Sequence, residues 1–258
     1  MKTIILCGGL GSRLAEETHI KPKPMVEIGG RPMLWHIMKI YEAHGVQDFT
    51  LALGYKGEVI KDYFLNYHAR CSNLTIQLKN GQVEYSEPTA ENWRLSLIDT
   101  GTATMTGGRL LRLKPFVQSA GTFMLTYGDG VADVNVTALL AFHRAHGKTA
   151  TVTAVRPSAR FGGMHIGDGL VRDFKEKPQS GEGWINGGFF VFEPAIFNYL
   201  QNDATILEQS PLETLVQEKQ LMAYEHPGYW QCMDTVRDRD ALQAAWQSGQ
   251  APWLKGQR

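Results

Sequence analysis

The stretch Leu6-Cys7-Gly8-Gly9-Leu10-Gly11-Ser12-Arg13-Leu14 decides the fold, because it joins a short apolar run to a candidate helix. The run, Thr3-Ile4-Ile5-Leu6, has the composition of a buried strand. Three glycines in four positions let the backbone approach an anion closely, so that several N–H groups can converge on it. A strand, a glycine loop and a helix entry in this order suit phosphate binding, and Arg13 adds a fixed positive charge.

The spacing of these glycines matches neither common nucleotide-binding loop. No Gly-Lys-Ser/Thr ending follows, as a P-loop requires, and Leu14 stands where a dinucleotide-binding loop has its third glycine. A tight turn without a ligand is the alternative interpretation. The rest of the chain must therefore decide between a binding loop and a turn.

Composition places the chain among ordinary globular proteins. Apolar residues make up 43% and charged residues 20% of its 258 residues, which is enough for one large domain with a full core. Lysine and arginine together number 26, as do aspartate and glutamate, so we expect neither nucleic acid nor a membrane as a partner. The N-terminus runs straight into the glycine loop and no apolar run reaches membrane-spanning length, which predicts a cytoplasmic protein. The three cysteines form no CxxC pair, which argues against a disulfide framework and a structural zinc site.

Strands and helices alternate along the first half of the sequence. We expect helices over 32–41, 59–67 and 136–146 and strands over 49–53, 122–127 and 150–155, the pattern of a parallel sheet with crossover helices. After residue 160 the texture changes to short strands and glycine turns, with helical patterns again near 195–200, 211–219 and 236–247. The sequence thus predicts an α/β fold in one domain over 1–258, whose later strands join the first sheet and form a pocket wall.

Two aspartates each follow a strand-like run. Asp129 lies between Gly128 and Gly130 directly after the strand expected at 122–127, at the carboxyl edge of the sheet, where a carboxylate can hold a metal. Asp234 precedes the helix expected from 236, where an N-cap is the structural alternative. The two would form a Mg²⁺ pair only if the fold brings them together, which their spacing alone does not show.

Other candidate motifs are weaker when taken alone. Glu176-Lys177-Pro178 closes a strand-like run, and a solvated surface pair is its plainer interpretation. Asn186-Gly187 stands at the head of a very apolar run, but Asn-Gly is also the commonest hairpin turn. His143 and His146 lie three residues apart on an expected helix without a third ligand nearby, so we expect surface histidines.

The sequence contains no serine or cysteine in the setting of an activated nucleophile beside a histidine base. Transfer of a nucleotidyl group to a sugar phosphate requires neither. A phosphate monoester, with a second pKa of about 6, is already ionised at neutral pH and can attack without a general base. Cations, backbone amides and Mg²⁺ would then supply the electrostatic stabilisation.

These motifs, in this order, resemble the sugar-1-phosphate nucleotidylyltransferases over essentially the whole chain. The resemblance rests on the glycine loop, Lys21-Pro22-Lys23-Pro24-Met25, Gly128-Asp129 and Glu176-Lys177-Pro178. The runs Asp99-Thr100-Gly101 and Thr104-Met105-Thr106-Gly107-Gly108-Arg109 are similar to the cytidylyltransferase branch of that family.

The resemblance implies a Rossmann-like three-layer fold with a mixed, mostly parallel sheet and an added small β-rich region in the second half. It implies a mainly nucleotide-binding half over 1–150 and a mainly sugar-binding half, with the C-terminal helices, over 151–258. CTP and glucose 1-phosphate would be the substrates, Mg²⁺ the cofactor, and CDP-glucose the product, made for dideoxyhexoses of bacterial O-antigen. The enzyme would be a homo-oligomer, namely a hexamer.

The resemblance also assigns three groups of site residues. The nucleotide would be bound by Leu6, Gly8, Gly9, Leu10, Gly11, Ser12, Arg13, Lys23, Thr104, Arg109 and Gly128. The sugar phosphate would be bound by Glu176, Lys177, Asn186 and Gly187, and Mg²⁺ by Asp129 and Asp234. The catalytic set would be Arg13, Lys23, Asp129, Lys177 and Asp234.

Within this assignment, Arg109 suits the acceptor edge of cytosine, because a guanidinium has only donors. Three alternatives stay open: a thymidylyl- or uridylyltransferase, a glycosyltransferase that consumes nucleotide-sugars, and a non-catalytic nucleotide sensor. The glycine loop with Arg13 and Lys23 favours a triphosphate substrate over a nucleotide-sugar.

Overall fold

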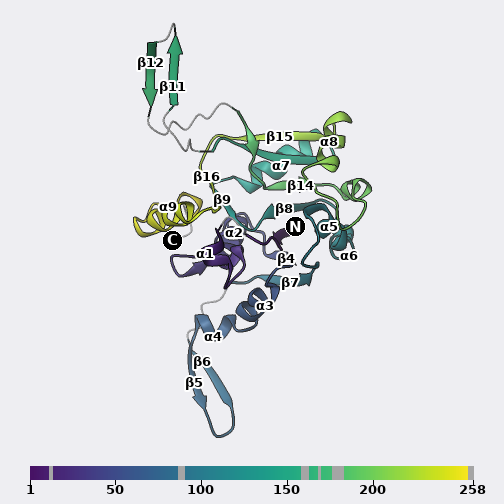
Figure 1. The fold of residues 1–258 in the computed structure, drawn as a ribbon. Coiled ribbons are helices and arrows are strands. Elements are labelled where there is room, and N and C mark those ends of the chain that lie inside the picture. The colour runs from purple at the N-terminus through teal and green to yellow at the C-terminus, as the bar shows by residue number, and fades with distance from the viewer. Residues whose placement is uncertain (12–13, 87–90, 158–162, 168–169, 176–182, 255–258) are drawn as a thin grey trace.

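A mixed β-sheet runs through the centre of the computed structural model, which describes residues 1–11, 14–86, 91–157, 163–167, 170–175 and 183–254 (Figure 1). Within these residues the sheet has eight strands, in the order β13-β10-β14-β8-β1-β4-β7, with β15 paired to β10. Their bounds are β1 (Lys2–Cys7), β4 (Asp48–Leu53), β7 (Arg94–Asp99), β8 (Phe123–Tyr127), β10 (Ala150–Val155), β13 (Ile185–Asn186), β14 (Phe190–Phe192) and β15 (Leu221–His226).

Pairing in this sheet is parallel around β1 and antiparallel around β14. β1 pairs in parallel with β4 and β8, β4 pairs in parallel with β7, and β10 does so with β15. β14 runs antiparallel to β8 and β10, and β13 antiparallel to β10. Three strands after residue 160, β13, β14 and β15, therefore extend the first sheet, as the sequence predicts, whereas β11, β12 and β16 pair outside it.

Side chains that alternate along β1 pack into two separate cores, one on each face of the sheet. Ile5 and Cys7 belong to one core, and Ile4 and Leu6 to the other. The first core includes side chains from α2 (Met33–Glu42), α3 (Gly57–Leu65), α7 (Val136–His146) and α9 (Val236–Gln247). The second includes side chains from α5 (Thr106–Arg112), α6 (Lys114–Val117), η4 (Pro194–Tyr199) and α8 (Ser210–Gln217). This confirms the three-layer α/β architecture.

The long helices begin and end where local signals place them. Pro32 immediately precedes α2, and Gly45, with φ of +79°, lies just past its end. Asn135 caps α7 by accepting the Ala138 N–H, and α9 starts with a capping box. The remaining helical elements are α1 (Ala15–Thr18), η2 (Lys23–Met25), α4 (Tyr67–Cys71), η3 (Gln118–Ala120) and η5 (Pro252–Leu254).

Four small antiparallel pairs surround the central sheet. They are β2 (Glu27–Ile28) with β3 (Arg31–Pro32), β5 (Asn73–Gln77) with β6 (Gln82–Ser86), β9 (Gly130–Ala132) with β16 (Trp230–Cys232), and β11 (Gly163–Gly167) with β12 (Leu170–Lys175). The β5–β6 and β11–β12 hairpins project from opposite ends of the molecule (Figure 1). The β9–β16 pair matters most for the site, because it joins residues about a hundred positions apart.

The β5–β6 hairpin carries an apolar face that is open to solvent. Leu74 lies opposite Tyr85 and Ile76 opposite Val83, so the four side chains share one face. Between 38% and 49% of each is exposed. Because an isolated two-stranded hairpin is marginally stable in water, this face is a candidate contact surface.

The expectation of a surface histidine at position 143 needs correction. His143 is not a surface residue: its ring is 1% exposed, with Nδ1 2.8 Å from Thr151 Oγ1 and Nε2 3.2 Å from Glu193 Oε1. It follows Val136 and Leu139 on the buried side of α7.

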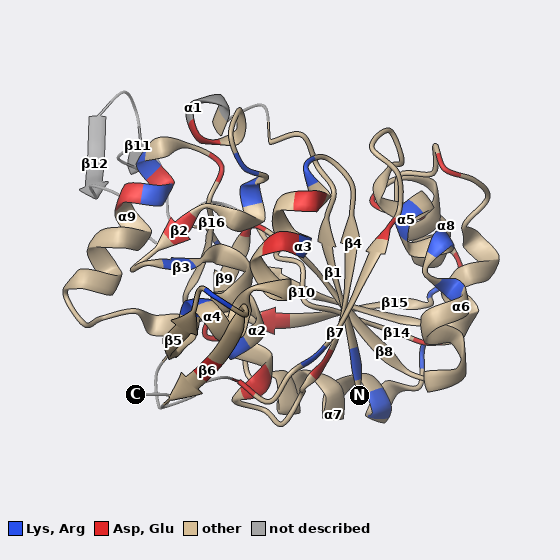
Figure 2. Cartoon of the chain, turned by 90° about the horizontal axis from the view of Figure 1, so that it is seen from below, with Lys and Arg blue, Asp and Glu red and all other residues tan. Residues whose placement is uncertain are grey.

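Among the described helices, none combines the length and apolar character needed to cross a bilayer. Basic and acidic residues are interspersed along the elements (Figure 2).

Candidate active site

A cavity of about 340 Å³ lies at the carboxyl ends of β1 and β8. Parallel strands deliver their loops to this edge of a sheet, which is where ligands bind in open α/β folds. The cavity is lined by the glycine loop, η2, the start of α5 and the turn after β8. The lining residues are Leu6, Cys7, Gly8, Gly9, Gly11, Lys23, Pro24, Thr104, Met105, Thr106, Arg109, Tyr127, Gly128 and Asp129.

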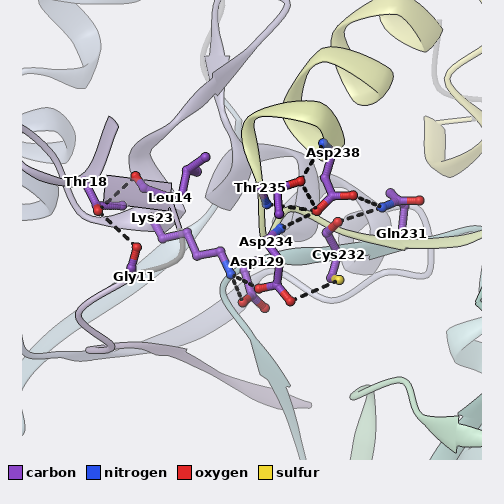
Figure 3. A network of polar contacts seen from close by, with 10 residues as sticks. All are labelled: Gly11, Leu14, Thr18, Lys23, Asp129, Gln231, Cys232, Asp234, Thr235 and Asp238. Atoms are coloured by element: carbon purple, nitrogen blue, oxygen red, sulfur yellow. Dashed lines mark hydrogen bonds and ion pairs between the residues drawn. The ribbon is translucent and has the colours of Figure 1, made fainter. Parts of the chain in front are cut away.

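Lys23 lies between two aspartates from distant parts of the chain (Figure 3). Its Nζ is 2.7 Å from Asp129 Oδ2 and 2.5 Å from Asp234 Oδ1, and only 10% of its side chain is exposed. Burial alone would lower the pKa of the Lys23 ammonium, but its contacts with Asp129 and Asp234 outweigh burial and raise the pKa. Lys23 is therefore a charged lysine that offsets part of the negative charge of the carboxylate pair.

Asp234 reaches this position through the β9–β16 pair and the start of α9. The Met233 N–H donates to Asp129 O at 2.8 Å, which fixes the two loops side by side. Thr235, not Asp234, is the N-cap of α9, and Asp238 accepts the Asp234 and Thr235 N–H groups. The Asp234 carboxylate is thus left to face Lys23 rather than being used as a cap.

The donor set of this carboxylate pair fits a hard divalent cation. Mg²⁺ binds in nucleotide sites through one or two carboxylates, with waters and substrate phosphates as its other ligands. Asp129 and Asp234 already converge on a cation, the Lys23 ammonium. The described residues contain no group of three or more His, Cys, Asp or Glu side chains that could hold a metal. The neighbouring Cys232 is a neutral thiol, since burial and the nearby carboxylates raise its pKa to about 12.

The glycine loop is held in shape by Thr18. The Thr18 hydroxyl lies 3.0 Å from both Gly11 O and Leu14 O, and its proton is shared between these carbonyls. Gly11 has φ of +65°, and a Cβ there would lie 2.7 Å from Thr18 Cγ2. Position 11 therefore requires glycine for both its backbone conformation and its close packing.

Arg109 joins three loops at the edge of the sheet. Its Nη1 donates to Leu53 O at 3.0 Å, Thr100 Oγ1 at 2.7 Å and Gly101 O at 2.8 Å. Its Nη2 donates to Gly8 O at 3.0 Å and Thr102 O at 3.3 Å. Burial lowers the pKa of Arg109, although a guanidinium stays charged at neutral pH. These loops follow β1, β4 and β7, so Arg109 holds the cavity wall together. Recognition of a base by the Arg109 side chain stays a prediction.

Asn186 meets the cavity through Tyr127. Its Nδ2 donates to the Tyr127 hydroxyl at 3.1 Å, and its Oδ1 accepts the Gly188 N–H at 2.9 Å. Gly187 is buried beside it, and a Cβ there would lie 2.5 Å from Val155 Cγ1. The predicted sugar-side residues 186 and 187 thus adjoin the predicted nucleotide-side wall.

The structure brings together most of the predicted site residues that it describes. Nine of them line the cavity, namely Leu6, Gly8, Gly9, Gly11, Lys23, Thr104, Arg109, Gly128 and Asp129. Leu10 is 61% exposed and is not in that lining. Ser12, Arg13, Glu176 and Lys177 lie outside the described residues.

Sequence reasoning missed Tyr127 and Glu208. Tyr127 ends β8 directly before Gly128, so its position beside the Gly-Asp motif could have indicated it. Glu208 accepts a hydrogen bond from Tyr127 at 2.6 Å. It lies in a loop 81 residues further along the chain, and nothing in the surrounding sequence points to it.

The glycine-lined cavity and the two aspartates that converge on Lys23 lie within a segment that matches a known family. The nucleotidyl transferase model matches residues 2–243, and the chain belongs to that family. Glucose-1-phosphate cytidylyltransferase of Salmonella typhimurium is 53% identical to this chain over 253 residues, which cover 98% of each protein. The protein of the same name from Salmonella typhi matches equally. UDP-glucose pyrophosphorylase complexed with UDP-glucose shares the fold, with a TM-score of 0.68 at 17% identity over 96% of this chain and 98% of that one.

Proposed function

We propose that this protein transfers CMP from CTP to α-D-glucose 1-phosphate, giving CDP-glucose and pyrophosphate, with Mg²⁺ as cofactor. The observation that carries the proposal is the position of Asp129 and Asp234, which converge on Lys23 beside the glycine loop. The choice of CTP and glucose 1-phosphate is supported by the 53% identity to the Salmonella cytidylyltransferase over nearly the whole of both chains.

The reaction is a displacement at the α-phosphorus of CTP. An oxygen of glucose 1-phosphate attacks in line, the bond from the α-phosphorus to the bridging oxygen breaks, and pyrophosphate leaves with the electron pair. The nucleophile is an ionised phosphate, so no general base is needed. The barrier is electrostatic, since two anions must meet while charge accumulates on the transferring group.

The chain's own residues supply positive potential at this point. Gly8, Gly9 and Gly11 would present backbone to the triphosphate, and Lys23, which also lines the cavity, adds an ammonium. Asp129 and Asp234 would hold Mg²⁺, which would screen the phosphate charges and orient the triphosphate. With Mg²⁺ on these carboxylates, the Lys23 ammonium would be available to contact the phosphates.

Further residues complete the proposed site by resemblance. Ser12 and Arg13 would bind the triphosphate, and Thr104, which is 7% exposed in the cavity wall, would lie near the base. Glu176, Lys177 and Asn186 would bind the sugar phosphate. In this assignment one domain over 1–258 divides into a nucleotide half up to residue 150 and a sugar half after it.

We place this activity in the cytoplasm, in a homo-oligomer that supplies CDP-glucose for dideoxyhexoses of O-antigen. Three cysteines without a disulfide, Cys7, Cys71 and Cys232, suit a reducing compartment. The exposed apolar face of the β5–β6 hairpin supports self-association. A hexamer is the expected state by resemblance.

Pyrophosphate release tests the proposal directly. Purified protein is incubated with glucose 1-phosphate and Mg²⁺, with CTP, dTTP, UTP, ATP and GTP in separate reactions, and the panel is repeated without metal. We expect release chiefly with CTP and dependent on Mg²⁺.

Each other outcome has a distinct meaning. Release chiefly with dTTP or UTP would retain the reaction and overturn the base assignment. Release from CTP without glucose 1-phosphate would indicate hydrolysis. Absence of release with every nucleotide, repeated with other sugar 1-phosphates, would overturn the reaction class.

A further inference from the structure

Asn186 is held at both ends of its amide group. Its Oδ1 accepts the Gly188 N–H at 2.9 Å, and its Nδ2 donates to the Tyr127 hydroxyl at 3.1 Å. In a flipped amide, Nδ2 would face the Gly188 N–H, which is also a donor. The hydrogen bonds therefore select one orientation of this side chain.

Tyr127 favours that orientation of the Asn186 amide because the proton of its own hydroxyl is donated to Glu208. Its hydroxyl donates to Glu208 Oε1 at 2.6 Å, and a phenol is protonated at neutral pH. A hydroxyl has one proton, so toward Asn186 it can only accept. The Tyr127 ring is fixed in turn by an edge-to-face contact with Phe190, with ring centroids 5.9 Å apart.

Glu208 is anchored by a second hydrogen bond. Thr106 Oγ1 donates to Glu208 Oε2 at 2.6 Å and accepts the Leu207 N–H at 2.9 Å. Each carboxylate oxygen therefore has one hydroxyl donor, and the two donors, Thr106 and Tyr127, both line the cavity. The chain Thr106–Glu208–Tyr127–Asn186 connects the wall near the start of α5 to the residue predicted to bind the sugar.

We infer that Tyr127 and Glu208 are positioning residues that fix the Asn186 amide in one orientation and thereby set the affinity for the sugar phosphate. The inference rests on the proposed function, in which Asn186 binds the sugar. In this orientation the second Nδ2 proton of Asn186 has no partner among the described residues, and it is available to donate to a sugar oxygen. Without Tyr127 and Glu208, the amide keeps its Gly188 contact but loses the hydrogen bond that aligns Nδ2.

The test compares the KM for glucose 1-phosphate with the KM for CTP in Tyr127→Phe and Glu208→Ala. Tyr127→Phe retains the ring and its contact with Phe190 and removes only the hydroxyl. We expect both variants to raise the KM for glucose 1-phosphate about tenfold, the effect of losing one aligned hydrogen bond, and to change the KM for CTP less than about twofold. The matched control is Tyr199→Phe, which removes a tyrosine–glutamate hydrogen bond, to Glu218 at 2.5 Å, outside the cavity.

A double-mutant cycle tests whether Tyr127 acts through Asn186. The KM for glucose 1-phosphate of Tyr127→Phe/Asn186→Ala should equal that of Asn186→Ala within about twofold. Independent, multiplicative effects would overturn the inference, as would equal increases in both KM values or no increase. The assay uses the nucleotide and the sugar phosphate with which the wild-type protein is most active. If the wild-type protein is inactive with every pair of substrates, the proposed function and this inference are both overturned. If the wild-type protein is active and the variants have unchanged KM values, this inference alone is overturned.

Discussion

Lys23 Nζ and Asp234 Oδ1 lie 2.5 Å apart although 211 residues separate them in the sequence. The same ammonium contacts Asp129, so one lysine bridges two carboxylates drawn from different thirds of the chain. The arrangement resembles a metal site whose cation is a side chain. We therefore expect both the stability of the folded protein and the rise in Tm on adding Mg²⁺ to depend on Lys23.

Replacing Lys23 by methionine should destabilise the metal-free protein and increase its response to Mg²⁺. The change leaves Asp129 and Asp234 facing each other, at a cost of about 2 kcal/mol, because Asp129 is partly exposed and the penalty for a fully buried pair is larger. In this variant Mg²⁺ need not displace an ammonium. Thermal melting with and without MgCl₂ should show a larger rise in Tm for Lys23→Met than for wild type. Lys21→Met, which loses only a surface pair with Glu27 at 3.7 Å, is the control, and equal Mg²⁺ shifts in all three proteins would contradict the idea.

Gly8 and Gly9 should differ sharply in their tolerance of alanine. A Cβ at Gly8 would lie 2.1 Å from Arg109 Cζ, whereas a Cβ at Gly9 would meet none of the described residues within 4 Å. Gly8→Ala must displace the buried guanidinium, so we expect a loss of about 2 kcal/mol in unfolding free energy and weaker CTP binding. Chemical denaturation and calorimetry on both variants check this. Comparable stability losses in Gly8→Ala and Gly9→Ala would argue against the packing account.

Arg109 should not be replaceable by lysine. An ammonium cannot reach the carbonyls of Leu53, Gly8 and Gly101 together, so buried acceptors lose their donors at a cost of about 2 kcal/mol. Arg109→Lys should lower Tm and raise the KM for CTP. Arg112→Lys, on the same helix but paired with Asp203 at the surface, should do neither. A stable Arg109→Lys protein with normal CTP kinetics would show that the loops are held by other contacts.

His36 should make the protein less stable in mild acid. Its ring is fully buried, Nε2 donates to Ile28 O at 2.8 Å, and Nδ1 accepts from Trp253 at 3.2 Å, so the neutral ring is the native form. Burial lowers its pKa from 6.5 to about 4. The unfolded state therefore binds more protons between these values: the contribution to stability is complete above pH 6.5 and is lost as the pH falls toward 4. Urea unfolding should show about 2 kcal/mol less stability from this group at pH 5 than at pH 7. In His36→Gln this part of the pH dependence should disappear, and an unchanged slope would assign it elsewhere.

The β5–β6 hairpin should carry part of a self-association surface. Ile76 lies on its apolar face, whereas Thr75 faces the other side, opposite Glu84. Ile76→Lys should shift the mass measured by light scattering toward a smaller species, and Thr75→Lys, which gains an opposite charge across the strand pair, should not. An unchanged mass for Ile76→Lys would exclude this face from the assembly.

Elements with clear caps or apolar periodicity are predicted well from the sequence, and two edge strands are not. The expected helices 136–146 and 236–247 and the strand 150–155 coincide with α7, α9 and β10, because caps and apolar periodicity agree there. The sequence does not predict β7 and β15. Among the described strands, β7 ends the sheet and β15 pairs with β10 alone, so each has a neighbour on one side and a weaker apolar signal.

In the candidate site too, features formed by neighbouring residues are predictable from the sequence, and contacts between residues far apart in the chain are not. The glycine loop and the turn at Asp129 are visible in the sequence, because each is a local motif after a strand. The convergence of Asp129 and Asp234 depends on the pairing of β9 with β16, two three-residue strands that have little signal of their own. The expectation of a surface His143 is wrong because its spacing from Val136 and Leu139 places it on the buried side of the helix.

The long separation between Lys23 and its two aspartates also dictates an order of events during synthesis on the ribosome. β1 can pair with β4 and β8 once about half of the chain has emerged, which completes the inner strands around the glycine loop. Asp234 emerges last, just before α9, and contacts of such high sequence separation form late in folding. A nascent chain would thus hold the glycine-lined cavity before it holds the pair of aspartates. Any product of premature termination before residue 234 could retain nucleotide contacts while lacking turnover.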